Sequence, residues 1–142
     1  MEKILDLISR EVEQAFEANG YDSKFGRVSL SNRPDLCEYQ CNGAMAAAKE
    51  YKCAPFLISD KVADSLKDNI MFSAVDSVKP GFLNLRLDHE YLAAYLRQMS
   101  ADAGRLGCGK SKEPKKIMID YGGPNVAKPL HVGHLRSAII GE

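Results

Sequence analysis

Several features that would narrow the function at once are missing from this sequence. Its 142 residues hold 19 Lys and Arg and 19 Asp and Glu, so the formal net charge is +0. Any nucleic acid must therefore be bound by a local patch and not by bulk charge. No apolar run is long enough to span a bilayer, and the first residues begin an acidic amphipathic helix. We expect a cytoplasmic protein with no membrane partner.

Cysteine and histidine are also scarce. The four cysteines, at positions 37, 41, 53 and 108, lack the C-x-x-C spacing of a zinc site, and an even count alone is poor evidence for disulfides. Small buried thiols behave as hydrophobes, so we interpret these cysteines as core residues and predict no metal site. The hydrophobic content of 45% and the charged content of 27% are typical of one globular domain with part of a second.

Helical and strand patterns alternate over the first hundred residues. Helices are expected at 4–18, 43–51, 55–69 and 89–103, with Asn42 and Asp88 as caps of the second and fourth. Strands are expected at 24–30, 36–41, 71–78 and 82–87. The last two flank Lys79-Pro80-Gly81, where a type II turn would close a hairpin. This order predicts the α+β class, with a two-layer domain of helices and an antiparallel sheet over 1–104.

The composition of the sequence changes after residue 104. Residues 105–114 are rich in Gly and Lys and are interpreted as a linker. Apolar alternation restarts at Ile117, which predicts a strand at 117–121, a Gly-rich turn, and a helix after His131. Residues 115–142 are therefore predicted to form a separate strand and helix.

The last strand of the first domain has two different faces. Three leucines, at 83, 85 and 87, point one way, which places Phe82, Asn84 and Arg86 on the other. An aromatic ring beside an amide and a guanidinium can stack an unpaired base and bind its edge. The alternative is a strand covered on both sides or an isolated surface Phe. The residues alone favour that alternative slightly.

Two of the three histidines lie three residues apart in the stretch Gly123-Pro-Asn-Val-Ala-Lys-Pro-Leu-His-Val-Gly-His134. The first turn of a helix has unpaired N–H groups and the positive end of the helix dipole, so it favours an anion such as a phosphate. Gly133 allows close approach to the backbone, and His131 and His134 can donate hydrogen bonds to charge that develops on a reacting phosphate. The alternatives are that the two histidines form half of a metal site or a helix cap. For a histidine pair at this spacing without the surrounding sequence, these two alternatives together would hold about half the probability.

This stretch resembles the HIGH signature of class I aminoacyl-tRNA synthetases, and residues 124–141 are similar to the arginyl-tRNA synthetases in particular. Two earlier segments, Asp35-Leu-Cys-Glu-Tyr-Gln-Cys-Asn-Gly-Ala-Met45 and Pro80-Gly-Phe-Leu-Asn-Leu85, resemble the additional N-terminal domain of that family. The resemblance spans most of the chain. It implies that 115–142 is the first strand-helix unit of a Rossmann-like catalytic domain.

The resemblance also implies a two-step reaction and its residues. Arginine attacks the α-phosphate of ATP, with Mg²⁺, and the 3′-terminal adenosine of tRNA(Arg) then takes the arginyl group. His131 and Gly133 would line the ATP site, His134 would contact both arginine and nucleotide, and Asn125 would hold the α-amino group of L-arginine. Lys128 is a candidate phosphate contact. Many relatives have Ser where Gly123 stands, so only backbone groups remain for arginine at that position.

For tRNA, the resemblance implies that the additional domain binds the outer corner at the D loop. Phe82 and Asn84 match the residues that do so, and Arg86 and Lys79 are further candidates beside them.

No second phosphate-binding lysine motif and no anticodon-binding domain follow within the chain. We therefore expect an N-terminal fragment of an arginine–tRNA ligase that is inactive alone, from a monomeric enzyme, with a truncated tail that seeks cover against a second copy. The alternatives are a free-standing tRNA-binding module and another class I-like nucleotidyl transferase.

Overall fold

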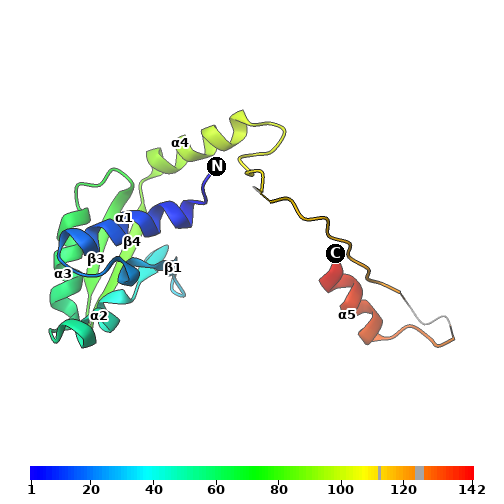
Figure 1. Ribbon diagram of the computed structural model, residues 1–142, viewed down its shortest axis with the longest axis horizontal. Coiled ribbons are helices and arrows are strands. Elements are labelled where there is room, and N and C mark those ends of the chain that lie inside the picture. Colours follow the sequence, from blue (N-terminus) through cyan, green and yellow to red (C-terminus); the bar gives the residue numbers. More distant parts are fainter. Residues whose placement is uncertain (112, 124–126) are drawn as a thin grey trace. The chain divides into compact units, whose positions relative to one another are not determined.

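The computed structural model describes residues 1–111, 113–123 and 127–142, and these form two compact units, Met1–Gly109 and Lys110–Glu142 (Figure 1). The division falls inside the segment that the sequence predicted as a linker. Among the described residues, no helix combines the length and the apolar character needed to cross a membrane.

The first unit contains a four-stranded antiparallel sheet with strand order β1-β2-β4-β3. Its strands are β1 (Val28–Leu30), β2 (Tyr39–Cys41), β3 (Phe72–Val78) and β4 (Phe82–Leu87). Together with the helices, this sheet confirms the predicted α+β class. The register places Cys41 opposite both Val28 and Leu83, so these three side chains lie on one face of the sheet.

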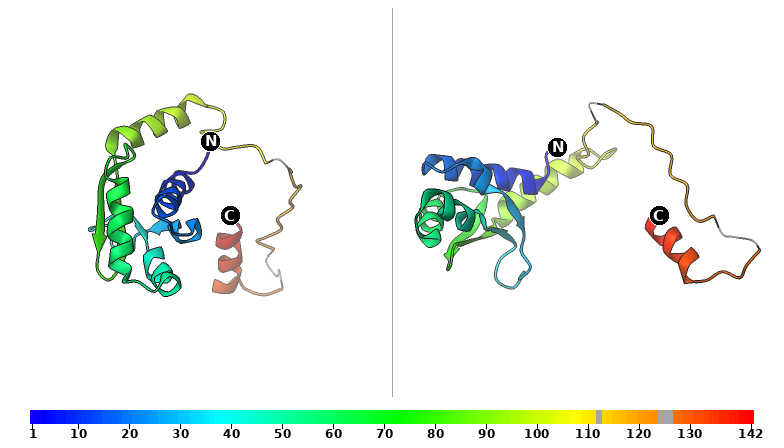
Figure 2. Two further views of the ribbon diagram at one scale, coloured as in Figure 1. Left: turned by 60° about the vertical axis from the view of Figure 1, so that its left-hand side comes forward. Right: turned by 60° about the horizontal axis from the view of Figure 1, so that its bottom comes forward.

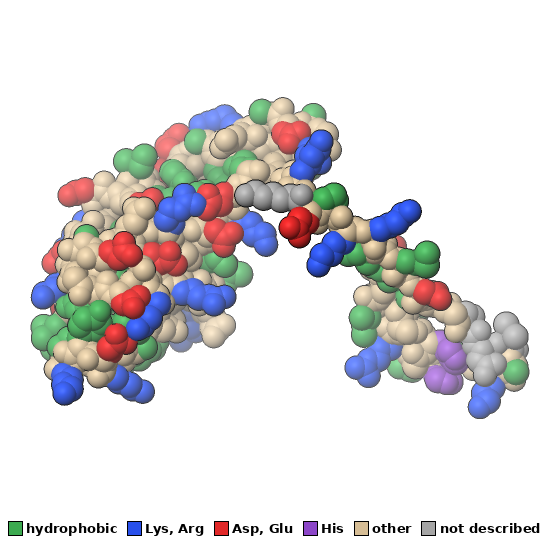
Figure 3. Space-filling model, viewed as in Figure 1, with side chains coloured by type: hydrophobic (Ala, Val, Ile, Leu, Met, Phe, Trp, Pro, Cys, Tyr) green, Lys and Arg blue, Asp and Glu red, His purple; other side chains and the backbone are tan. Residues whose placement is uncertain are grey.

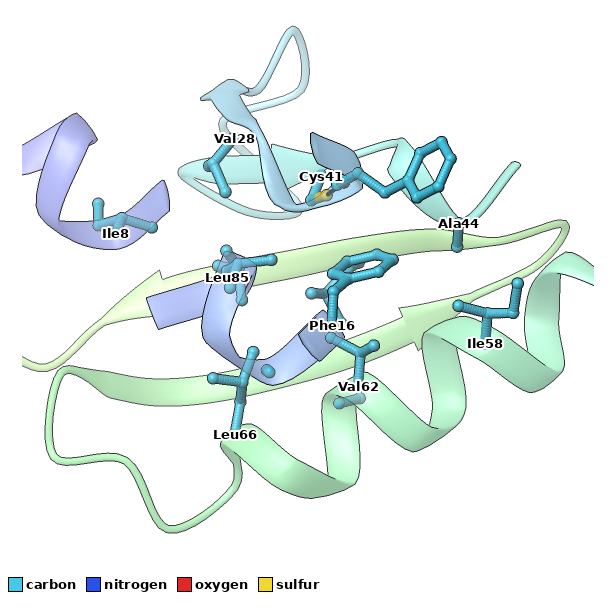
Figure 4. Close-up of a cluster of buried hydrophobic side chains, with 14 of the residues drawn as sticks. Ile8, Phe16, Val28, Cys41, Ala44, Ile58, Val62, Leu66 and Leu85 are labelled. Atoms are coloured by element: carbon cyan, nitrogen blue, oxygen red, sulfur yellow. Dashed lines mark hydrogen bonds between the residues drawn. The ribbon is translucent and has the colours of Figure 1, made fainter. Parts of the chain in front are cut away.

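Helices cover that face and leave the other one open (Figure 2). The helices of the first unit are α1 (Ile4–Ala18), α2 (Gly43–Tyr51), α3 (Pro55–Leu66) and α4 (His89–Ala101). Ile8 and Phe16 from α1 and Ile58 and Val62 from α3 are buried against Leu85 of the sheet (Figure 4). Each such side chain stabilises the fold by about 1.5–3 kcal/mol relative to an exposed one.

Of the two predicted helix caps, one forms and the other does not. The Asp88 carboxylate accepts hydrogen bonds from the backbone N–H groups of Glu90 and Tyr91, at 2.9 and 3.0 Å, and so begins α4 as predicted. The Asn42 side chain makes no capping hydrogen bond to α2, so the predicted cap is wrong. The amide of Asn42 is exposed instead.

The predicted strand at 24–30 is wrong in its first half. The Asp22 carboxylate accepts from the backbone N–H of Lys24 at 2.9 Å and caps a 3-10 helix, η1 (Ser23–Gly26). Gly26 lies against α1 so closely that an added Cβ would be 2.4 Å from the Cα of Glu13. The chain therefore packs as a turn there, and the strand begins only at Val28.

The hairpin between β3 and β4 forms, but its turn differs from the predicted type II turn. The Lys79–Pro80 peptide bond is cis, Gly81 has no positive φ, and the Gly81 N–H donates to the carbonyl of Val78 at 3.0 Å. Proline thus occupies the third position of a type VI turn. Gly81 is needed for space, because a Cβ would lie 2.6 Å from the Cβ of Pro55.

The second unit contains helix α5 (Val132–Gly141), as predicted, while the predicted strand at 117–121 is not formed. A strand needs a hydrogen-bonded neighbour, and no described segment pairs with these residues. Tyr121 instead lies on α5, where a Cβ on Gly141 would be 2.2 Å from the Tyr121 ring. Its hydroxyl donates to the Glu142 carboxylate, and this hydrogen bond raises the pKa of Tyr121.

Candidate functional site

The open face of the sheet carries the residues that the sequence proposed for RNA. On β4 the side chains of Leu83, Leu85 and Leu87 are buried, whereas Phe82 and Asn84 on the opposite face are half-buried. Phe82 lies opposite Val78 in the register, and Val78 is exposed, so the two form an apolar strip at one end of the face. Such a strip can support a stacked base.

Asn84 is fixed by a neighbour on β2. Gln40 lies directly opposite in the register and donates from Nε2 to Oδ1 of Asn84 at 2.9 Å. This leaves the Asn84 amide N–H groups and the Gln40 amide oxygen free to meet a ligand, because each amide has one further polar group. The open face therefore offers a donor and an acceptor side by side.

The Arg86 side chain makes contacts within the first unit that the sequence did not predict. Its Nη2 donates to the backbone carbonyls of Asp35 and Leu36, at 3.1 and 2.7 Å, and so braces the loop between β1 and β2. The Nζ of Lys79 lies over the ring of Phe56 on α3, 5.5 Å from the ring centre. The structure therefore brings Phe82 and Asn84 together and gives Arg86 and Lys79 other contacts.

Gln40 on the open face, and Asn42 and Arg27 directly beside the ends of β2 and β1, were not among the predicted site residues. Gln40 and Asn42 alternate with the buried Cys41, a signal that was visible in the sequence. Their position beside Asn84 and Phe82 depends on strand register, which alternation alone does not give.

In the second unit, the two histidines cap helix α5 reciprocally. The backbone N–H of Gly133 donates to Nδ1 of His131 at 3.0 Å, and the backbone N–H of His131 donates to Nδ1 of His134 at 3.2 Å. The ring centres are 4.2 Å apart. This is the geometry of a capping box with imidazoles in place of the usual hydroxyl and carboxylate. Figure 3 shows histidine side chains together on the surface of this unit.

The capping arrangement itself requires a glycine at position 133, in addition to any need for close approach of a ligand. A Cβ at that position would be 2.8 Å from Cε1 of His131, so a larger residue would displace the ring. Gly122 has φ +75°, which favours glycine, whereas Gly123 has open space around it that a serine side chain would fit. The backbone turn therefore depends on Gly122 more than on Gly123.

A hollow of about 590 Å³ lies at the start of α5, within the usual range for small-molecule sites. Its lining includes Gly123, His131 and His134, together with Leu130 and Ser137. Lys128 is exposed and is not part of the lining, and Asn125 lies outside the described residues. Within the described ranges, no group of three or more His, Cys, Asp or Glu could hold a metal ion.

Comparison with protein families gives two matches. The arginyl tRNA synthetase N terminal domain matches residues 2–87, and the catalytic domain of class I (R) tRNA synthetases matches residues 96–142. The two matches together cover the chain except for residue 1 and residues 88–95, and they include all of α5.

Individual relatives agree. The arginine–tRNA ligase of Agathobacter rectalis is 66% identical over 142 residues, which is 100% of this chain and 24% of the relative. That of Alkaliphilus oremlandii is 51% identical over the same length, again 24% of the relative. The chain therefore spans about a quarter of the length of the curated relatives it matches.

Solved structures also resemble the chain. The arginyl-tRNA synthetase from Plasmodium falciparum has a TM-score of 0.68 at 25% identity, over 99% of this chain and 27% of that one. The Thermus thermophilus arginyl-tRNA synthetase has a TM-score of 0.55 at 24% identity, over 98% of this chain and 22% of that one, and supports the fold alone.

Proposed function

Because the chain belongs to the arginyl-tRNA synthetase family, we propose that it is the N-terminal part of a cytoplasmic enzyme that joins L-arginine to tRNA(Arg). The observation that carries this proposal is the reciprocal histidine cap at the start of α5. Both Nδ1 atoms accept from the backbone, so the remaining ring N–H of each neutral imidazole, at Nε2, is available to a ligand.

The reaction has two steps. A carboxylate oxygen of arginine attacks the α-phosphorus of ATP, which enters with Mg²⁺ on its phosphates, and pyrophosphate leaves. A ribose hydroxyl of the 3′-terminal adenosine of the tRNA then attacks the activated carbonyl, and AMP leaves. The first step builds charge on the phosphate oxygens, where positioned N–H donors stabilise the transition state more than the ground state.

The residues of the second unit take the following roles. His131 and His134 donate to nucleotide phosphate oxygens, and the first turn of α5 adds its dipole. His134 also contacts arginine, Gly133 lets the nucleotide approach, and the backbone at Gly123 lies beside the amino acid. Lys128 contributes a positive charge near the phosphates, and Asn125 binds the α-amino group.

The first unit binds the outer corner of the tRNA. A D-loop base stacks on Phe82 and is bound at its edge by Asn84, whose amide is oriented by Gln40. Arg86 shapes this surface by holding the loop of Asp35 and Leu36, and Lys79 lies beside it on the β3–β4 turn. The unit would thus supply affinity for tRNA and no chemistry.

A chimaera tests this function directly. Placed in the Agathobacter rectalis enzyme instead of the matching 142 residues, this chain should support aminoacylation of tRNA(Arg) and, with tRNA(Arg) present, arginine-dependent ATP–pyrophosphate exchange. His134→Ala in the chimaera should lower exchange by about 100-fold or more, the typical effect of losing one such donor, while tRNA affinity stays within a few-fold.

The chain by itself should give no exchange. An inactive chimaera that folds, or a His134→Ala chimaera with wild-type exchange, would contradict the proposal. Turnover by the chain alone, without tRNA, would favour the class I-like nucleotidyl transferase instead.

A further inference from the structure

The register of the sheet places an arginine in line with Phe82. Val28 lies opposite Cys41, and Cys41 lies opposite Leu83, so Arg27, directly before β1, and Asn42, directly after β2, come next at the end of the sheet where Phe82 begins β4. Val28 is buried, whereas Arg27 and Ser29 are exposed, which places both on the open face by alternation. Arg27 and Asn42, just beyond the paired residues of β1 and β2, thus lie at the same end of the sheet as Phe82 and Val78.

Arg27 differs from the other cations near this face. Lys24 is held by Asp22 and Glu50, with Nζ–oxygen distances of 3.2 and 2.9 Å, and Arg86 donates to two backbone carbonyls. Within the described part of the chain, the Arg27 side chain makes no ion pair or hydrogen bond. Its guanidinium therefore keeps all of its donors for a ligand.

The surroundings of Arg27 suit a phosphodiester. A hollow of about 310 Å³ is lined by Lys24, Arg27, Ser29 and Asn42, among others. The Asn42 amide is exposed and is not used as a helix cap, whereas the exposed Ser29 hydroxyl donates to the carbonyl of Gln40 at 3.4 Å. The Asn42 amide can therefore donate to a phosphate oxygen, as amide side chains do in nucleic-acid complexes.

The charge on the open face is not symmetric. Asp76 on β3 lies opposite Asn84 and is exposed, so the β3 side of the face is negative. Arg27 is on the β1 side, two strand spacings or about 10 Å from Phe82. A nucleotide with its base on Phe82 is therefore repelled if its phosphate points to Asp76 and attracted if it points to Arg27.

We propose that Arg27 binds a backbone phosphate of the tRNA nucleotide whose base stacks on Phe82, so that the RNA strand follows the β1 edge of the sheet. This inference rests on the proposed tRNA-binding function of the open face. The ribose and the long arginine side chain together bridge the distance between the two contacts. Phe82 then supplies stacking, and Arg27 supplies the salt-dependent part of the affinity.

The experiment measures binding of the full chain to a tRNA(Arg) transcript at several salt concentrations between about 50 and 200 mM. Arg27→Gln should weaken binding about three- to tenfold at low salt and flatten the slope of log K against log salt by about 0.7 to 1, the value of one phosphate contact. Phe82→Ala should weaken binding with an unchanged slope. Lys61→Gln is the matched control, because it removes one exposed positive charge from α3 on the other side of the sheet.

The outcomes separate the two proposals. If Phe82→Ala weakens binding while Arg27→Gln changes neither affinity nor slope, the Arg27 contact is wrong and the tRNA-binding face stands. If Lys61→Gln flattens the slope as much as Arg27→Gln, the effect is one of net charge and the contact is again wrong. If the wild-type chain does not bind, or if Phe82→Ala has no effect, the proposed face itself fails.

Discussion

Leu85 and Phe82 lie on the same strand but face opposite sides of the sheet, so their truncations should differ in kind. Leu85 is 0% exposed, and Leu85→Ala should lower the free energy of unfolding by about 2–5 kcal/mol through a core cavity. Phe82→Ala should cost about 1 kcal/mol or less, because its ring is partly exposed on the open face. Thermal melts of both variants check this. A melt in which Phe82→Ala is the less stable variant would reverse the orientation of β4.

Side-chain alternation was enough to predict Phe82 and Asn84 on one face, because the period of two is a property of any strand. Alternation was not enough to predict the hydrogen bonds of Arg86. The carbonyls that Arg86 binds lie 50 and 51 positions away in the sequence, on a loop whose approach to β4 depends on tertiary packing. Arg27 was missed for the same reason, since its neighbours across the sheet depend on register.

At the scale of elements, the start of α2 depends on one glycine. A Cβ on Gly43 would lie 1.7 Å from the carbonyl oxygen of Phe25, which is backbone and cannot move aside easily. Gly43→Ala should therefore destabilise the first unit by about 1–3 kcal/mol or more. Gly104→Ala is the control, since nothing lies within 4 Å of its added Cβ, and it should change stability by less than about 0.5 kcal/mol. Urea denaturation of the two variants makes the comparison, and equal midpoints would contradict it.

The elements that the sequence predicted well are those with strong local signals. Helix α1 follows the apolar spacing and is terminated by Asn19 as its C-cap and by Gly20, which has φ +80°. The failures have non-local causes. Gly26 packs on Glu13 of α1, which favours a 3-10 helix over a strand, and residues 117–121 lack a neighbouring strand among the described residues. Apolar alternation predicts the capacity to form a strand, but not the presence of its partner.

For the whole molecule, the two units predict a simple pattern of proteolysis. The residues around Gly109 and Lys110 have no helix or strand and are exposed, so a protease should cut there first. The product should be a resistant fragment ending between about 104 and 110, with an unchanged melting temperature. A limit digest in which the two units remain joined in one fragment would contradict this division. Early cleavage within the segment from β1 to β4 would contradict it as well.

The second unit is also expected to associate. Its large apolar side chains are exposed, Met118 at 94% and Ile117 at 76%, with Val132 and Ile140 similar. On α5, Val132 and Ile140 line one apolar hollow together with Leu135 and Ile139, and exposed apolar surface of this kind favours contact with another protein. The full chain should therefore show concentration-dependent association in light scattering, and the fragment without residues 110–142 should not. Association that persists in the shorter fragment would place the contact in the first unit.

The histidine cap of α5 has a consequence for how mutations there are interpreted. Each ring has one nitrogen that accepts from the backbone, so in the proposed site a single side chain would both begin the helix and bind the substrate through its other nitrogen. An alanine at His131 removes the two roles together, and a lost rate cannot be credited to either alone. His131→Asn separates them, because an asparagine oxygen caps helices well while the outward imidazole donor is gone. In genetic terms the motif is pleiotropic, because one substitution at either histidine would change both the start of α5 and the proposed substrate contact.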